Sequence, residues 1–315
     1  MQISVVVITY EPSINKLVST LTSIINQKGV TFEIIVSDDG SQRINFSEVE
    51  PVIRAVVSPS IPLTIVKNRQ NSGTVLNIQN ACRCAKGEYI KIISPGDLLF
   101  DNDVLKDLYD HATENPQQSF FFGRAAYYSN DESLKTYSLS TPLYPEIYNK
   151  KSHLIHKIAM MHKHGPVGAS YFYKTVVFVK YLDCIANHVK FTEDYTTSIL
   201  YILDGGNLSF VDRKVVWYEY GHGLSTGNID KWMGIYEQDC AEFYNVARRI
   251  HPDDKCLVFR FGDKRKRLLH PMIIACLLWV NCISSWKRDH ITNSQDQIDD
   301  LIDKLQQNHQ LINNE

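Results

Sequence analysis

Short apolar runs alternate with amphipathic stretches along the first third of the chain. Residues 3–8, 32–37, 63–67 and 89–93 are mostly apolar, which is typical of strands that are buried on both faces. Between the first two runs, apolar residues recur every three or four positions over 13–26, which predicts an amphipathic helix. Strands that alternate with helices favour an α/β fold with a doubly wound sheet.

Two further helices are expected in this part of the chain. Residues 74–86 form the first, and Gly87 is placed to stop it. Residues 101–115 form the second, for which Asp101 or Asn102 is a suitable N-cap.

The pattern becomes less regular beyond Pro116. Long strands are expected at 120–128 and 208–218, and a polar, tyrosine-rich stretch at 129–151 follows the first of them. The chain is mostly helical from Asn228 onward. The shorter elements expected are a helix at 154–161, a strand at 169–172, a helix at 192–203 and a last helix at 295–311.

The composition is that of an ordinary globular protein. Of the 315 residues, 44% are apolar and 22% are charged, which is enough to bury a sizeable core. The formal net charge of -2 gives no reason to expect a nucleic-acid partner. Seven scattered cysteines lack the spacing of a zinc site, and the first apolar run is too short for a signal peptide. We therefore expect reduced thiols and a cytoplasmic location.

One segment raises the question of a membrane contact. Residues 264–288 combine a basic run with Trp279 and Trp286, on an apolar stretch shorter than the roughly 20 residues that a spanning helix needs. The pattern suits a helix that lies peripherally in the membrane surface, and it suits equally a helix that packs on the rest of the protein. The heptad-like spacing of the last helix also suits a contact between two copies of the chain.

Polar and acidic residues directly follow three of the expected strands. The first strand ends in Thr9-Tyr10-Glu11, the second ends in Asp38-Asp39, and the fourth runs into Ser94-Pro95-Gly96-Asp97. Open α/β sheets bind ligands at the carboxyl ends of their strands. These segments therefore indicate a nucleotide site at one edge of the sheet.

Several short motifs carry a resemblance to a known family. They are Ser4–Tyr10, Ile34–Ser41, Asn71-Ser72-Gly73 with Asn77, Ala85–Ile90 and Glu193-Asp194. Each is weak alone, but their order and spacing resemble the family 2 inverting glycosyltransferases, which share the GT-A fold and use nucleotide-diphosphate sugars. The resemblance implies a Rossmann-like mixed sheet in a catalytic domain over 1–227, followed by a helical C-terminal region over 228–315. Within that domain, 1–115 would form the nucleotide-binding half and 116–227 the acceptor half.

The resemblance implies a set of nucleotide-binding residues. They are Thr9, Tyr10, Glu11, Asp38, Asp39, Asn71, Ser72, Gly73 and Asn77. Asp39 would accept the N–H of a uracil-type base, because a carboxylate at a strand end can accept that proton. Two plainer interpretations stay open: Asp38-Asp39-Gly40-Ser41 forms only a tight turn, and Ser72 is only an N-cap.

The resemblance places the diphosphate and its metal ion at Ser94–Asp97. Ser94 and Gly96 occupy the two positions at which the family carries Asp, so Asp97 is the remaining carboxylate. Mg²⁺ or Mn²⁺ held by Asp97 would neutralise charge on the leaving phosphate, since hard cations prefer oxygen ligands. Alternatively Asp97 only caps the next helix, and metal dependence is correspondingly open.

The remaining candidates are an acidic pair and a histidine. Inverting transfer needs a carboxylate that takes the proton of the acceptor hydroxyl; the resemblance assigns this base to Asp194, with Glu193 shaping the pocket. Two acids at a helix start are also common as partners of the helix dipole. His222 resembles a residue of the family's flexible loop over the diphosphate, and a solvated histidine in a mobile loop is the alternative.

These residues predict an inverting glycosyltransferase with a UDP-sugar as donor and a glycan or lipid-linked glycan as acceptor. The resemblance implies bacterial surface polysaccharide biosynthesis at the inner face of the membrane. Because the Asp-x-Asp element is incomplete, a nucleotide-sugar-binding protein with impaired catalysis is the alternative. A dinucleotide-dependent oxidoreductase is set aside, since no glycine follows the first strand over 9–14.

Overall fold

The computed structural model describes most of the chain up to residue 261. The described residues are 1–128, 145–149, 152–161, 165–221, 223, 227 and 229–261, with 272, 276 and 303. Four features of the sequence lie wholly or almost wholly outside them: His222, most of the stretch at 129–151, the segment 264–288 and the last helix at 295–311. Within the described part, no helix combines the length and apolarity that crossing a membrane requires.

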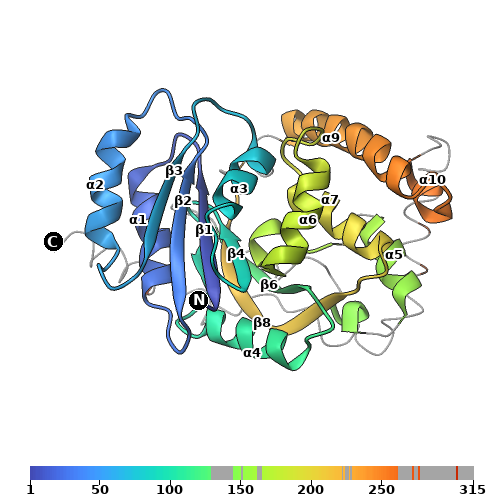
Figure 1. Ribbon diagram of the computed structural model, residues 1–315, viewed down its shortest axis with the longest axis horizontal. Helices are drawn as coiled ribbons and strands as arrows, with labels where there is room; N and C mark the ends of the chain where they lie inside the picture. The colour runs from blue at the N-terminus through green and yellow to red at the C-terminus, as the bar shows by residue number, and fades with distance from the viewer. Residues whose placement is uncertain are drawn as a thin grey trace.

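An eight-stranded mixed sheet forms the centre of the protein (Figure 1). Its strands lie in the order β3-β2-β1-β4-β7-β6-β8-β5. They are β1 (Ile3–Thr9), β2 (Phe32–Asp38), β3 (Leu63–Lys67), β4 (Tyr89–Ile93), β5 (Leu98–Leu99), β6 (Phe120–Tyr128), β7 (Tyr171–Lys174) and β8 (Leu208–Glu219). The strands β1 to β4 are parallel to one another, whereas β7 is antiparallel to both β4 and β6. The expected α/β fold with a doubly wound mixed sheet is confirmed.

The last long strand, β8, points in the same direction as β1. Because β7 is antiparallel to both of its neighbours, β6 runs parallel to β4, and β8 pairs in parallel with β6. The carboxyl ends of β1, β2, β4 and β8 therefore lie at the same edge of the sheet. That edge carries Thr9, Asp38, Ser94 and Glu219.

Helices cover both faces of the sheet (Figure 1). One face packs against α1 (Ile14–Ile25), α2 (Phe46–Val56) and α4 (Val104–Glu114). The other packs against α3 (Thr74–Cys82), α5 (His153–Met161), α6 (Thr175–Ile185), α7 (Glu193–Leu203), α9 (Ile229–Ile250) and α10 (Lys255–Phe261). Successive residues of a strand face opposite sides, so Val5 and Val7 of β1 join the first core and Val6 joins the second. Two 3₁₀ turns, η1 (Pro145–Asn149) and η2 (Gly168–Ser170), complete the described elements.

Two helices are not predicted by the sequence pattern. Helix α2 contains Pro51, and α6 begins with the stretch Thr175–Val179, which is rich in β-branched residues that favour strands. The strand expected at 169–172 is β7, which begins at Tyr171 and ends only where α6 starts. Tertiary packing buries Phe178 and Leu182 in the core, and this burial favours the helix over the strand that the local sequence prefers.

The expected end of α3 is wrong. The helix ends at Cys82, so Gly87 does not stop it. Gly87 instead lies against β1, where a Cβ atom would come within 2.3 Å of the main-chain nitrogen of Ser4. Its N–H donates to Ser4 Oγ at 2.8 Å. The glycine therefore permits a close approach between the start of β4 and β1.

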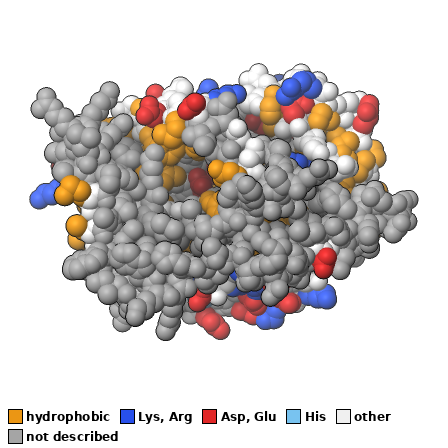
Figure 2. Space-filling view, turned by 180° about the vertical axis from the view of Figure 1, so that it is seen from behind, with side chains coloured by type: hydrophobic (Ala, Val, Ile, Leu, Met, Phe, Trp, Pro, Cys, Tyr) orange, Lys and Arg blue, Asp and Glu red, His pale blue; other side chains and the backbone are white. Residues whose placement is uncertain are grey.

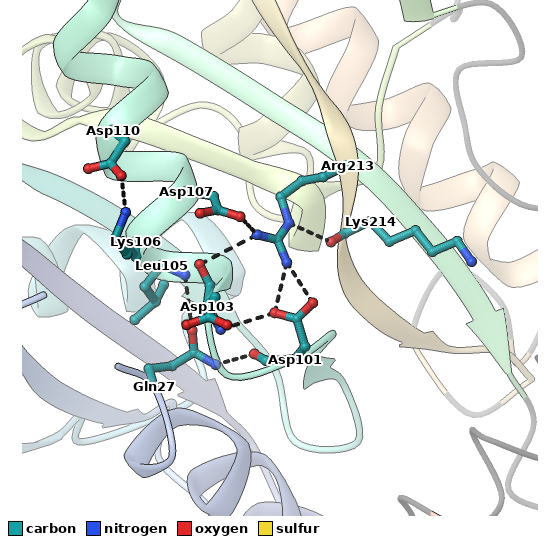
Figure 3. A network of polar contacts seen from close by, with 9 residues as sticks. All are labelled: Gln27, Asp101, Asp103, Leu105, Lys106, Asp107, Asp110, Arg213 and Lys214. Carbon is teal, nitrogen blue, oxygen red and sulfur yellow. Dashed lines mark hydrogen bonds and ion pairs between the residues drawn. The ribbon is translucent and has the colours of Figure 1, made fainter. Parts of the chain in front are cut away.

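An arginine of β8 holds the segment that leads into α4 (Figure 3). The guanidinium of Arg213 donates to both carboxylate oxygens of Asp101, at 2.7 and 2.6 Å, and it also forms an ion pair with Asp107. Both bonds come from the same Nη2 atom, and hydrogen bonds between two charged groups of this kind are among the stronger ones. These contacts tie β8 to the connection between β5 and α4.

The N-cap expected at Asp101 or Asn102 is therefore wrong. Helix α4 begins at Val104, and no side chain at the cap position accepts one of its N–H groups. Instead, Gln27 reaches across from the end of α1 and accepts the N–H of Leu105 at 3.0 Å (Figure 3). A long-range contact thus does what a local cap would do.

Helix α9 is bound to the loop that precedes α7. The carboxylate of Asp239, which is only 4% exposed, accepts the three successive main-chain N–H groups of residues 190–192 at 3.1, 2.8 and 3.1 Å. Phe243 and Ala247 of the same helix are fully buried in the core. The core thus continues beyond residue 227, and the expected domain division at that point stays a prediction.

Replacing Asp239 with alanine tests this connection. Asp239→Ala leaves three N–H groups without their acceptor, of which the N–H of Thr192 is buried, and we expect a loss of about 3 kcal/mol in the free energy of unfolding. Urea denaturation measures it. Asp230→Ala is the matched control, since Asp230 is exposed in the first turn of the same helix. Equal losses in the two variants would contradict the role given to Asp239.

Candidate active site

A cavity of about 650 Å³ opens at the carboxyl edge of the sheet. Its volume is in the range of sites for small molecules. The walls come from the ends of β1, β4 and β8, the starts of α1, α3 and α7, the loop 166–169 and the beginning of α9. Figure 2, which shows the molecule from behind, has an acidic side chain recessed among hydrophobic ones in a hollow of the surface.

The structure brings together acidic residues that are far apart in the sequence. Asp39, Asp97 and Asp194 all line this one cavity. The other sequence candidates that line it are Thr9, Tyr10, Glu11, Asn77, Ser94 and Glu193. Five candidates do not line it: Asp38, Asn71, Ser72, Gly73 and Gly96. His222 is outside the described residues.

Asp39 is held in place by the start of α3. Its two carboxylate oxygens accept the main-chain N–H groups of Ser72 and Gly73, at 3.0 and 2.9 Å. Burial nevertheless raises the pKa of Asp39, because the loss of solvation outweighs these bonds. These two N–H groups at the start of α3 are thus already donated to Asp39. Ser72 is not an N-cap, since Gly73 holds that position and Ser72 Oγ donates to the carbonyl of Gln70.

Two other nucleotide-site candidates serve the loops around the cavity. Asp38 accepts both the N–H and the hydroxyl of Ser41, which closes the turn after β2. Glu11 accepts the main-chain N–H groups of residues 42–44, at 2.7, 2.9 and 3.0 Å, and these bonds lower its pKa. Both contacts shape the strand ends on which the cavity depends.

Thr9 and Asn77 differ in how their polar groups are satisfied. The amide of Asn77 exchanges hydrogen bonds with Ser37, accepting from its hydroxyl at 2.6 Å and donating to its carbonyl at 3.1 Å. Thr9 is 4% exposed, and its Oγ1 is buried without a hydrogen-bond partner among the described residues. An unpaired buried hydroxyl is costly, so this group indicates a ligand at the end of β1.

Strand pairing sets the surroundings of Asp97. The short strand β5 is antiparallel to β8, with Leu98 opposite Trp217. Continuing this register places Gly96 opposite Glu219. The N–H of Glu219 donates to Asp97 Oδ1 at 3.0 Å.

A buried lysine lies beneath this part of the cavity. Lys91 of β4 is fully buried, and its ammonium donates to the carbonyls of Ala169, Tyr171 and Ile92. Burial lowers the pKa of Lys91 to about 7 and raises the pKa of Asp97 to about 7. Strand β7 pairs with β4 only at Tyr89 and Ile90, and does not reach Lys91. Beyond that pairing, the contacts of Lys91 with carbonyl groups hold the loop at Ala169 against β4.

The donor set fits a hard divalent cation that a substrate completes. Among the described residues, no three His, Cys, Asp or Glu side chains gather as a metal site. Mg²⁺ in phosphate-transfer sites is held by one or two carboxylates, with phosphate and water oxygens as the other ligands. Asp97 offers such an oxygen in the cavity, at the end of β4.

Glu193 and Asp194 form an acidic pair at the start of α7, in which Glu193 is buried and Asp194 is half-buried. Burial raises the pKa of Asp194 to about 6, although the N–H of Tyr195 donates to its Oδ1 at 2.7 Å. The pKa of Glu193 is raised well above its usual value by burial and then by the charge of Asp194. Of the two acids, Glu193 holds its proton more tightly, so Asp194 is the one that ionises first as the pH rises.

The comparisons with known proteins identify the family. A family model described as glycosyl transferase family 2 matches residues 4–181, which is more than half of the chain. The chain belongs to glycosyl transferase family 2. It is therefore a glycosyltransferase, as the sequence motifs predict. No curated protein matches the chain as a relative.

Solved structures resemble this family 2 glycosyltransferase in fold. The mannosyltransferase PcManGT from Pyrobaculum calidifontis, in complex with GDP-Man and Mn²⁺, is 15% identical; the match covers 90% of this chain and 75% of that one, with a TM-score of 0.56. S. aureus TarS in complex with UDP-GlcNAc is 16% identical over 94% and 78% of the two chains, with a TM-score of 0.54. TarS without a named ligand is 18% identical over 98% and 81%, with a TM-score of 0.53. The expected GT-A fold is confirmed.

Two charged residues that line the cavity of this family 2 enzyme are absent from the candidates that the sequence indicates. They are Glu219 and Lys16, and the ammonium of Lys16 lies 2.7 and 2.8 Å from the two carboxylate oxygens of Glu219. A signal for Glu219 is present, because it is an acidic residue at the carboxyl end of a buried strand. The same criterion selects Asp38 and Asp39. Lys16 has no such signal, since it lies in an ordinary amphipathic helix.

Removing the unpaired hydroxyl of Thr9 should affect protein stability and nucleotide affinity in opposite directions. Thr9→Val removes a buried polar group that lacks a partner, so we expect the free protein to keep or gain up to about 1 kcal/mol of stability. If the hydroxyl bonds a nucleotide, binding of UDP should weaken about fivefold to tenfold. Thermal unfolding and calorimetric titration measure the two effects. Unchanged UDP affinity would remove Thr9 from the site.

Proposed function

We propose that the protein transfers one sugar from a nucleotide-diphosphate donor, a UDP-sugar, to a hydroxyl of a glycan acceptor, with inversion at the anomeric carbon. The observation that carries the proposal is the convergence of Asp39, Asp97 and Asp194 on a single cavity of donor size. They come from the ends of β2 and β4 and the start of α7, and each matches a different step of the reaction.

Asp39 and Thr9 support a role in nucleobase binding for the end of the cavity that they line. A carboxylate has about four lone-pair sites, so Asp39 can accept the N–H of a uracil while it keeps its bonds to the start of α3. Guanine also presents N–H donors. The donors in the two similar solved structures also carry different bases, with UDP-GlcNAc in TarS and GDP-Man in PcManGT. A nucleotide comparison therefore belongs to the test.

Asp97 supports the diphosphate-binding role of the middle of the cavity. Mg²⁺ or Mn²⁺ held there by its carboxylate would neutralise negative charge on the departing diphosphate. PcManGT is a structural neighbour with Mn²⁺. Six acidic side chains line the cavity, against the one basic side chain of Lys16 among the described lining residues, and this imbalance supports a cation beside an anionic donor.

Asp194 supports the role of general base. Its carboxylate accepts the proton of the acceptor hydroxyl as that oxygen attacks the anomeric carbon, and the nucleoside diphosphate leaves from the opposite side. A pKa of about 6 keeps it ionised at neutral pH and still basic enough to take a proton. Gly168 leaves room for it, since a Cβ atom there would lie 3.1 Å from Asp194 Oδ2.

The acceptor side of the proposal rests on the sequence resemblance. A glycan or lipid-linked glycan acceptor, bacterial surface polysaccharide biosynthesis, and a cytoplasmic location at the inner face of the membrane remain parts of it. Membrane contact through the segment 264–288 and pairing of two copies through the C-terminal helices are proposed on the same basis.

A donor screen tests the proposed function. Purified protein is incubated with UDP-sugars and GDP-sugars, with and without Mn²⁺, and thermal shift reports binding because a bound ligand raises stability by mass action. Release of nucleoside diphosphate with a glycan acceptor then reports transfer. We expect UDP-sugars to bind and turn over. Preference for GDP would contradict the donor assignment, and binding without any turnover would favour a protein with impaired catalysis.

Asp194→Asn separates chemistry from binding. We expect the rate of transfer to fall by about 10² to 10⁴, because an amide cannot accept the proton, while donor affinity stays nearly unchanged. Steady-state kinetics and UDP titration measure the two quantities. Asp204→Asn is a control on the turn after the same helix, where Asp204 pairs with Lys180 outside the cavity. Equal losses of rate and affinity in Asp194→Asn would show that Asp194 is not the base.

The pKa of Asp194 also sets a pH dependence. We expect kcat/KM to rise about tenfold per pH unit below about 6 and then to level off, as the base loses its proton. The folded protein holds this proton more tightly than the unfolded chain, so the stability contribution of Asp194 is full below the ordinary aspartate pKa of 3.8 and is lost as the pH rises through about 6. Asp194→Asn should therefore exceed the wild type in stability more at pH 8 than at pH 4. A rate that is flat from pH 5 to 8 would contradict the assignment.

A further inference from the structure

The turn after β4 lacks the second acid that its sequence motif implies, and a carboxylate from β8 lies in the space. A Cβ atom on Gly96 would come within 2.2 Å of Glu219 Oε2, so the carboxylate lies directly against the glycine. We propose that Glu219 supplies the second carboxylate of the divalent-cation site, together with Asp97. This inference rests on the proposed function and adds a cation ligand to it.

The register of strand pairing fixes the contact between Gly96 and Glu219. Antiparallel pairing of β5 with β8 aligns Leu98 with Trp217, which brings Gly96 opposite Glu219. Gly96 has a φ of 105°, a conformation that side chains rarely adopt, so the turn is made for a glycine at this point. An acid at position 96 would strain the turn and collide with Glu219. The carboxylate therefore comes from the neighbouring strand.

Two observations indicate that a ligand belongs between the two carboxylates. Asp97 is 6% exposed and lines the cavity, and Oε1 of Glu219 is buried and accepts no hydrogen bond from the described residues. Glu219 is 7% exposed and already holds a cation, because the ammonium of Lys16 lies within 2.8 Å of both of its oxygens. Hard divalent cations take carboxylate oxygens of this kind.

In the protein without ligand, the ammonium of Lys16 therefore occupies the place beside Glu219 that a divalent cation would take. A divalent ion that bridges Asp97 and Glu219 competes with the ammonium for the same carboxylate. Lys16 is the only basic side chain among the described residues that line the cavity. Once released from Glu219, its ammonium is available to the phosphates of the donor. The ion pair thus prepares the site for an anion that binds together with its metal.

The test measures binding of Mn²⁺ alone by electron paramagnetic resonance, which is independent of turnover. We expect Glu219→Gln and Asp97→Asn to weaken Mn²⁺ binding about tenfold or more. Lys16→Met removes the competing cation and should tighten Mn²⁺ binding. Asp212→Asn is the matched control, because Asp212 lies on β8 with its side chain 77% exposed and paired with Arg124. It should bind Mn²⁺ like the wild type.

Mn²⁺ affinity should rise in Lys16→Met and fall in Glu219→Gln if the two carboxylates hold a cation. A purely structural ion pair would not give these opposite changes. Weakened Mn²⁺ binding in both Lys16→Met and Glu219→Gln, or unchanged binding in Glu219→Gln, would overturn the inference. If Glu219→Gln does not fold, as judged by its melting curve, Lys16→Met decides: tighter binding supports the inference and unchanged or weaker binding overturns it. Failure of the proposed function is seen separately, as absence of UDP binding and transfer in the wild type.

Discussion

The reversal of a single strand, β7, is the constraint on which the site depends. Because β7 is antiparallel to both β4 and β6, the second half of the sheet returns to the direction of the first half, and β8 ends at the same edge as β1, β2 and β4. Without this reversal, Glu219 would lie at the opposite edge from Asp97. The cavity is therefore a product of strand direction, and the side chains only line what the sheet has placed.

Main-chain N–H groups make it possible to bury several carboxylates in a small volume. Asp39 receives two such groups from the start of α3, Asp97 receives one from β8, and Asp239 receives three from the loop before α7. Each bond offsets part of the cost of taking a charged group out of water. The same bonds tie separate elements together, so the position of each acid and the packing of its neighbours are coupled.

The electrostatics of the cavity are suited to a reaction in which charge moves. Acidic side chains outnumber basic ones in its described lining, burial raises the pKa of Asp194 and Glu193, and Lys16, the one lysine among the described lining residues, is paired with Glu219. An acidic cavity of this kind suits a cation, and its carboxyl groups have pKa values that are raised toward neutral pH. Membership of glycosyl transferase family 2 is consistent with both properties.

The sequence by itself determined the strands and three of the acids. The strands β1, β2 and β4 are readable because a strand buried on both faces must be apolar throughout, and Asp39, Asp97 and Asp194 are readable because short motifs accompany them. Helix α6 and the caps of α3 and α4 are not readable, because long-range packing overrides their local preferences. Only the tertiary structure places Glu219 against Gly96 and donates the N–H groups of Ser72 and Gly73 to Asp39. Those contacts depend on the register and direction of strands that lie far apart in the chain, and no local pattern encodes them.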